Sequence, residues 1–303
     1  RALADHRSVL ESLSIHFDSW FSERSMISSG AMDATLADLR AAGAVYEEGG
    51  AVWLRSTDHG DDKDRVLVKS DGQPTYLMPD VAYHRDKFAR ADRLVNVFGA
   101  DHHGYVVRMH AAMSVLGHDR EDLQIVITQL VNLQRDGREV RLSKRTGEMV
   151  ELADVVDEVG ADAARFTYLL LSVDSAQTFD MDLVASQVNE NPVFYVQYAH
   201  ARIHSVVGRA AAGGSVRGSL AEVDLSLLTH PREIEVMRSL HELPDVVARA
   251  CMERAPHQVT SWVRELASAF HGFYHDCRVV GPEVDPATTR ARLWLAEGAR
   301  IGL

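Results

Sequence analysis

Apolar runs and amphipathic stretches predict alternating strands and helices in the first half of the chain. Leu94–Phe98 and Ile125–Val131 are apolar, β-branched runs with the length of buried strands. Between them, Tyr105–Leu116 places apolar side chains at helical spacing and is followed by Gly117, a common helix stop. The pattern therefore predicts one βαβ unit with parallel strands and a right-handed crossover.

Shorter patterns extend this prediction on both sides. Residues 1–48 predict a helix, a short aromatic segment and a helix, while Ala51–Leu54 and Arg65–Val68 have the pattern of strands. Asn132–Leu142 alternates around Asp136-Gly137, which is a strong signal for a β-hairpin. Because the two long strands are parallel, the segments that follow them meet at one sheet edge, where open α/β sheets bind ligands.

After residue 150 the patterns predict helices, and from Asn191 onward they are all helical. Two short helices are expected at Glu151–Gly160 and Asp162–Ser172. Asn191 as cap and Pro192 in the first turn open a long helix that runs to Gly213-Gly214. Three further helices are expected, with starts near Pro231, Pro244 and Pro256.

Composition limits the class of protein. The 303 residues are 46% hydrophobic and 25% charged, without an apolar run of membrane-span length or a signal-peptide pattern. Cys251 and Cys277 lack metal spacing and suit a reducing cytosol. The net charge of −12 argues against indiscriminate nucleic-acid binding but leaves room for a local basic face.

The segment Val140–Gly147, VRLSKRTG, has the residues for polyphosphate binding. Three cations, Arg141, Lys144 and Arg145, surround Ser143 on a short stretch that ends in glycine. Cations stabilise charge that develops on a phosphoryl group, and glycine lets a loop move. A solvated basic surface loop is the alternative.

The run GADHHG at Gly99–Gly104 follows the first long strand and precedes a helix. Its small residues allow close approach of a ligand to the backbone, and the helix N-terminus favours anionic groups. A metal site at Asp101-His102-His103 is the alternative, but no third ligand stands at zinc-like spacing. The acids at Asp58, Asp61, Asp62 and Asp64 lack the pattern of an EF-hand and predict a solvated turn.

Together these segments resemble a known family. RLSKRTG resembles the KMSKS signature of class I aminoacyl-tRNA synthetases. With FDSWFSE, SDGQPTYLMPDVAYHRDKF, GADHHG, VGADAARF and NENPVFYVQYAHAR, the chain resembles bacterial arginyl-tRNA synthetases over nearly its whole length. The resemblance implies an α/β nucleotide-binding, Rossmann-like half-domain at 1–150, a helical connector at 151–190 and an all-α helical-bundle anticodon-binding domain at 191–303.

The resemblance also implies roles for the nucleotide-binding residues. Lys144 would stabilise pyrophosphate, with Ser143 and Arg145 positioning the loop. Arg141 departs from the lysine of the signature, which keeps the charge and changes its geometry. ATP would be held by Gly99, His102 and the backbone of Leu130 and Val131, with Mg²⁺ accompanying ATP and no structural metal.

Free arginine needs a carboxylate that accepts two guanidinium hydrogen bonds and a flat wall beside the side chain. Tyr76 and Asp80, four residues apart, could be brought to one pocket by a helical turn near Pro79. By resemblance this pair, His102 and Glu23 bind arginine. Tyr83 and His84 are weaker candidates.

By the same resemblance the partners are tRNA-Arg and L-arginine. Candidate tRNA-binding residues are Tyr198, Arg202, Tyr274 and Arg278, although aromatic residues on a helical bundle are usually core. The chain is expected to be cytoplasmic, monomeric and not bound to a membrane.

The HIGH tetrapeptide of class I synthetases does not occur in the sequence. We therefore expect the C-terminal portion of a longer arginine–tRNA ligase, inactive by itself. One alternative is a non-catalytic, synthetase-derived RNA-binding protein; another is an arginine-transferring enzyme of a different pathway, which would leave the helical domain unexplained.

Overall fold

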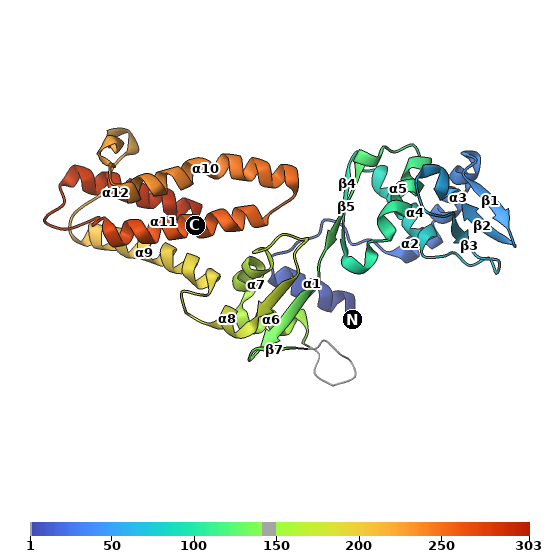
Figure 1. Cartoon of the computed structure of the whole chain (residues 1–303), viewed down its shortest axis with the longest axis horizontal. Coiled ribbons are helices and arrows are strands. Elements are labelled where there is room, and N and C mark those ends of the chain that lie inside the picture. The colour runs from blue at the N-terminus through green and yellow to red at the C-terminus, as the bar shows by residue number, and fades with distance from the viewer. Residues whose placement is uncertain (1, 141–149) are drawn as a thin grey trace. The chain divides into compact units, whose positions relative to one another are not determined.

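The computed structural model describes residues 2–140 and 150–303 (Figure 1). These residues form two compact units. The α/β unit comprises His16–Leu130 and Val173–Ala176, and the helical unit comprises Arg1–Ile15, Val131–Ser172 and Gln177–Leu303. These units are defined by contacts in space, so their bounds differ from the three domains 1–150, 151–190 and 191–303 expected from the sequence. That division of the chain stays a prediction.

The α/β unit contains a βαβ unit, whose strands β4 and β5 lie at one side of it (Figure 1). Strand β4 (Leu94–Gly99) pairs in parallel with β5 (Leu123–Thr128), from Leu94 opposite Leu123 to Gly99 opposite Thr128. Helix α5 (Tyr105–Val115) connects them and is followed by Gly117 at φ 87°. The predicted parallel strands and their helix are confirmed.

One face of this sheet is covered and the other is open. Leu94 and Leu123 are buried in a core with Met109 and Met113 of α5. Residues that alternate with them on β4 point the other way, and Val95 and Val97 are 47% and 64% exposed. Parallel sheets usually have both faces covered.

The predicted strand Ile125–Val131 extends three residues too far at its C-terminal end. β5 stops at Thr128, and Val131 begins β6 (Val131–Arg135), which belongs to the helical unit. At the break, the backbone N–H of Gln129 donates to the carbonyl of Val173, and Leu130 is 73% exposed. Thr128 and Gln129 interrupt the apolar run at this point, so the polar pair marks the place where the chain changes partner.

The rest of the α/β unit is a small antiparallel sheet with helices. The predicted strands Ala51–Leu54 (β2) and Arg65–Val68 (β3) are confirmed, and β1 (Val45–Glu48) pairs with β2. In the acidic turn, the Arg65 guanidinium binds the Asp61 carboxylate at 2.7 Å and also pairs with Asp62. Two of the four acids are therefore ion-paired, and the Asp61 side chain is buried, so the predicted solvated turn is wrong for this acid. The helices are α2 (Glu23–Ser28), α3 (Ala31–Ala41) and α4 (Leu77–Phe88).

The first part of the helical unit contains the predicted hairpin. β6 pairs antiparallel with β7 (Arg138–Glu139), and the turn residues Asp136 and Gly137 have φ of 50° and 69°. Both positive values suit the type I′ turn that Asp-Gly favours. β6 also pairs in parallel with β8 (Gln177–Asp180). The helices around this sheet are α1 (Ala2–Ser12), α6 (Leu152–Val159), α7 (Ala161–Tyr168) and α8 (Met181–Ala185).

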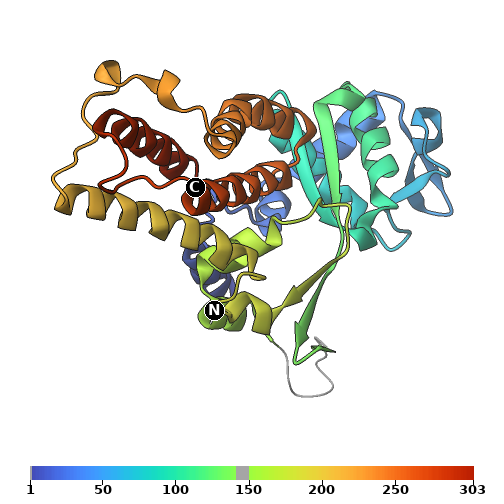
Figure 2. The same cartoon turned by 60° about the vertical axis from the view of Figure 1, so that its left-hand side comes forward.

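A helical bundle completes the helical unit, and Figure 2 shows α9 (Pro192–Ala212) beside α11 (His257–Asp276) and α12 (Pro286–Gly302). Its core contains Trp262, Phe270 and Phe273. The side-chain oxygen of Asn191 accepts hydrogen bonds from the N–H groups of Val193 and Phe194, so the predicted cap of the long helix is confirmed.

The predicted helix start near Pro244 is wrong. Pro244 lies inside α10 (Pro231–Glu253), and the last helix begins at Pro286 instead. The indole N–H of Trp262 donates to the carbonyl of Ser239, in the turn before Pro244, at 2.7 Å. Val236 and Val246 are buried on either side. This packing holds the helix together across a residue that cannot donate a backbone hydrogen bond.

None of the helices in the described ranges has the length and apolar character needed to cross a membrane.

Candidate functional site: a carboxylate beside the GADHHG turn, and an aromatic–arginine face

Asp80 lies in the first turn of α4, half-buried. The hydroxyl of Tyr105, the first residue of α5, donates a hydrogen bond to its Oδ2 at 2.5 Å. Burial, and then the carboxylate itself, raise the pKa of Tyr105, so the hydroxyl stays protonated and remains a donor. The bond joins α4 to the helix that follows GADHHG.

The backbone of Asp80 is fixed by a second contact. His84 Nδ1 lies 2.7 Å from the carbonyl oxygen of Asp80, so Nδ1 carries the proton. His84 Nε2 therefore accepts from Asn96 Nδ2 at 2.5 Å, and Asn96 Oδ1 accepts from Lys87 Nζ at 3.0 Å. Burial lowers the pKa of His84 to about 4, which keeps the imidazole neutral near pH 7.

His102 contacts the same tyrosine. The GADHHG run ends β4 at Gly99, forms a 3-10 turn at Ala100–His102 and enters α5 after Gly104. The His102 ring packs edge-on against Tyr105 with centroids 6.3 Å apart, and its side chain is 54% exposed. Tyr105 therefore joins two of the residues expected to bind arginine, Asp80 and His102.

Tyr76 and Glu23 have a different setting. Tyr76 is 91% exposed at the N-terminus of α4. The hydrogen bond to the Asp80 carboxylate comes from Tyr105 instead of from Tyr76. Glu23 is the exposed first residue of α2, which packs against α4. Just before α2, Phe21 stacks on Tyr83 of α4 at 4.1 Å. Their roles in binding arginine stay predictions.

The expected ATP-binding residues are Gly99, His102, Leu130 and Val131. The first two lie at the carboxyl end of β4, and the other two lie at the break between β5 and β6. Arg141, Ser143, Lys144 and Arg145 lie outside the described residues. In the described ranges, no group of three or more His, Cys, Asp or Glu side chains is placed to hold a metal ion.

The expected tRNA-binding residues lie on α9 and α11 and just after α11. The guanidinium of Arg202 stands 4.2 Å from the ring centre of Tyr198 and 5.0 Å from that of Tyr274. Its Nη1 lies 2.9 Å from Nδ1 of His271. We call these four residues the aromatic–arginine face. The structure thus brings together three of the four residues expected to bind tRNA, namely Tyr198, Arg202 and Tyr274.

Two surface grooves border this face. A groove of about 520 Å³ is lined in part by Tyr198, Arg202 and His271. A second, of about 280 Å³, is lined in part by Tyr274 and Arg278. The fourth candidate, Arg278, forms an ion pair with Glu283.

Sequence reasoning missed several of these residues. Tyr105 was assigned only to a helix, and Asn96 only to an apolar strand. The signal for Asn96 was its amide inside LVNVF, since a polar side chain on the covered face of a strand must find partners. His271 has no comparable signal, because only folding brings α11 beside α9.

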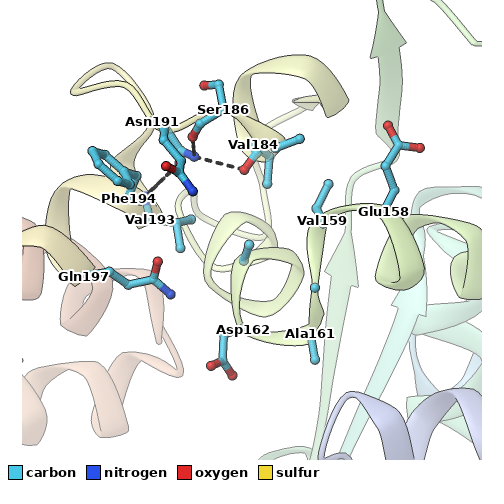
Figure 3. A pocket seen from close by; sticks show the side chains of 14 residues that line it. Glu158, Val159, Ala161, Asp162, Val184, Ser186, Asn191, Val193, Phe194 and Gln197 are labelled. Atoms are coloured by element: carbon cyan, nitrogen blue, oxygen red, sulfur yellow. Dashed lines mark hydrogen bonds between the residues drawn. The ribbon is translucent and has the colours of Figure 1, made fainter.

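A separate polar hollow of about 440 Å³ lies in the helical unit (Figure 3). The end of α6, the start of α7 and the start of α9 line it. Asn191 donates from Nδ2 to the carbonyls of Val184 and Ser186 and accepts at its oxygen, so its polar atoms are satisfied. Asn191 therefore closes the wall of the hollow and offers no group to a ligand.

Comparison with known proteins gives matches to family models along almost the whole chain. The catalytic-domain model of the class I tRNA synthetases (R) matches residues 6–206. The DALR anticodon binding domain matches residues 196–303, which contain α10, α11 and α12 and most of α9.

Individual relatives agree with these matches. The arginine–tRNA ligase of Frankia alni is 50% identical over 99% of this chain and 55% of its own length. That of Bacillus subtilis is 46% identical over 98% of this chain and 53% of its own length. The chain thus spans about half the length of the curated relatives that it matches.

Solved structures show the same likeness. A structure from Campylobacter jejuni assigned to the arginyl-tRNA synthetases superposes with a TM-score of 0.89 at 36% identity, covering 99% of this chain and 64% of that chain. Thermus thermophilus arginyl-tRNA synthetase gives a TM-score of 0.80 at 19% identity, covering 99% and 60%, which supports the fold.

Proposed function

The chain belongs to the arginyl-tRNA synthetase family of class I, and from this premise we propose that the protein attaches arginine to tRNA-Arg at the expense of ATP. The observation that carries the proposal is the match of one chain to both the catalytic and the anticodon-binding models of this family. Arginine and ATP give arginyl-adenylate and pyrophosphate, and the terminal ribose of the tRNA then takes the arginyl group.

In this proposal Asp80 binds the guanidinium of arginine. Asp80 is half-buried, and an aspartate carboxylate forms short, charge-assisted hydrogen bonds with a guanidinium. His102 contacts Tyr105, which is hydrogen-bonded to Asp80. We propose that Tyr76 and Glu23 supply the remaining contacts to arginine. Holding arginine in place contributes to catalysis mainly by positioning it against the α-phosphate of ATP.

ATP is proposed to bind at Gly99, His102, Leu130 and Val131, with Arg141, Ser143, Lys144 and Arg145 acting on its phosphates. Mg²⁺ accompanies ATP, because this ion usually binds through substrate phosphates and keeps several waters. The residues of this chain hold and orient arginine and the nucleotide.

The aromatic–arginine face, with Arg278, is proposed to bind the tRNA. Tyrosine rings stack on unpaired bases, and guanidinium groups contact bases or phosphates. With a net charge of −12 the chain needs such a local face to hold RNA. A cytoplasmic, monomeric protein with its domains divided at 150 and 190 is part of the same proposal.

The test is binding of this chain to a tRNA-Arg transcript, compared with the same transcript carrying a replaced anticodon, at matched salt. We expect tighter binding of the natural anticodon. Equal, salt-sensitive binding to both would overturn tRNA recognition, because phosphate contacts alone do not distinguish sequences.

A second measurement separates the ligase from a synthetase-derived protein that only binds RNA. Calorimetric titration with L-arginine should give saturable binding that Asp80→Asn abolishes. Retained tRNA selectivity without arginine binding would favour the RNA-binding protein.

A further inference from the structure

We propose that Tyr105 is a positioning residue that makes the Asp80 site select a planar guanidinium over an ammonium group. This inference rests on the proposed function, since it concerns how the same site distinguishes arginine from lysine. Its evidence is the hydrogen bond from the Tyr105 hydroxyl to Asp80 Oδ2 and the packing that fixes both partners.

A free aspartate carboxylate is a poor template for a planar ligand. The torsion that turns the carboxylate plane is broad and nearly two-fold, so its two oxygens do not keep one orientation. A guanidinium that binds two parallel hydrogen bonds needs both oxygens in one plane. The Tyr105 hydroxyl occupies one lone pair of Oδ2 and thereby fixes that plane, which leaves the second lone pair of Oδ2 and both lone pairs of Oδ1 to accept from a ligand.

Tyr105 is itself held in place. Its ring packs edge-on against Phe98 at 6.3 Å and His102 at 6.3 Å. The guanidinium of Arg108, one turn further along α5, lies 5.4 Å from its ring centre. The hydroxyl therefore approaches Asp80 from a fixed direction.

The backbone of Asp80 is fixed independently of Tyr105. The proton of His84 Nδ1 is donated to the Asp80 carbonyl, and His84 is tied to β4 through Asn96. Because α4 is anchored in this way, loss of the tyrosine hydroxyl should free the carboxylate plane without moving the helix. The expected effect is thus confined to ligand orientation.

Arginine and lysine respond differently to such a change. Lysine carries a compact charge with rotatable donors, so it needs a negative group but no fixed plane. Arginine presents a rigid fork and loses a bond when the plane turns. Selectivity, more than total affinity for cations, is therefore the property that Tyr105 controls.

The test compares Tyr105→Phe with the unmodified chain in calorimetric titrations with L-arginine, L-lysine and the uncharged L-citrulline. The substitution removes one hydroxyl and keeps the ring. Tyr168→Phe is the matched control, since Tyr168 is half-buried against Phe179 in the helical unit. Thermal unfolding of each variant monitors folding.

We expect Tyr105→Phe to weaken arginine binding about tenfold, as for loss of one hydrogen bond to a charged group, and lysine binding less than twofold. Tyr168→Phe should change neither. Equal weakening of both amino acids, or unchanged arginine binding, would overturn the inference alone. No arginine binding by the unmodified chain, or none lost in Asp80→Asn, would overturn the proposed arginine site and this inference with it.

Discussion

At the scale of single residues, the neutral imidazole of His84 makes stability depend on pH. Burial lowers its folded-state pKa from 6.5 to about 4. Between these values the unfolded chain binds a proton that the folded chain does not, so the folded state loses stability as pH falls. We expect the free energy of unfolding to drop by about 3 kcal/mol from pH 6.5 to pH 4, beyond the contribution of other groups.

Urea denaturation across this pH range measures the effect. His84→Gln should flatten the pH dependence, because glutamine does not titrate. His241→Gln, an exposed histidine of α10, should leave it unchanged. Parallel profiles for all three proteins would contradict a role for His84.

Arg202 is the residue through which the aromatic–arginine face should hold RNA. Its guanidinium stands between the rings of Tyr198 and Tyr274 and against His271. We expect Arg202→Ala to weaken tRNA binding about tenfold and to lower the salt slope by about one, as for one lost phosphate contact. Filter binding at several salt concentrations measures both.

Arg238→Ala, at an exposed arginine of α10, is the control and should change neither quantity. A loss of affinity with an unchanged salt slope would show that Arg202 acts by stacking and makes no phosphate contact.

At the scale of single elements, α9 depends on its first residue. Asn191 accepts two backbone N–H groups of α9 and donates to the carbonyls of Val184 and Ser186, while 2% exposed. Asn191→Ala leaves these groups buried without partners. We expect a loss of about 2 kcal/mol in the free energy of unfolding, measured with urea. Asn189→Ala, at an exposed neighbour, should cost far less.

Elements that carry their own signals could be predicted from sequence. The cap at Asn191 and the Asp136-Gly137 turn act on neighbouring residues, so their effect is visible locally. Pro244 misled because a proline normally marks a helix start or break. In α10 the burial of Val236 and Val246 outweighs that preference. Such tertiary contacts cannot be predicted from the local sequence of one segment.

The candidate site likewise could be predicted only in part from the sequence. Asp80 and His102 were found from chemistry and resemblance, and both contact Tyr105. Tyr105 itself is 25 residues from Asp80, so no local spacing connects them. The sequence offered Tyr76 as the nearer tyrosine, and the structure gives the bond to the distant one.

At the scale of the whole molecule, the two compact units have separate cores. Phe270 lies in the core of the helical unit, and Met109 lies in that of the α/β unit. We expect two calorimetric transitions. Phe270→Ala should lower one, and Met109→Ala the other, since each deletion costs about 2–5 kcal/mol in its own core. A single transition that both substitutions lower equally would contradict independent unfolding.

The open face of β4, with Val95 and Val97, has a consequence for concentrated solutions. Exposed valines on a strand attract one another between molecules, whereas the net charge of −12 keeps the molecules apart. At 0.01 M salt that repulsion extends roughly 30 Å, and at 1 M it extends roughly 3 Å. Light scattering should therefore report a second virial coefficient that turns from positive to negative as salt rises. Val97→Lys interrupts this apolar face, so it should move the change of sign to a higher salt concentration.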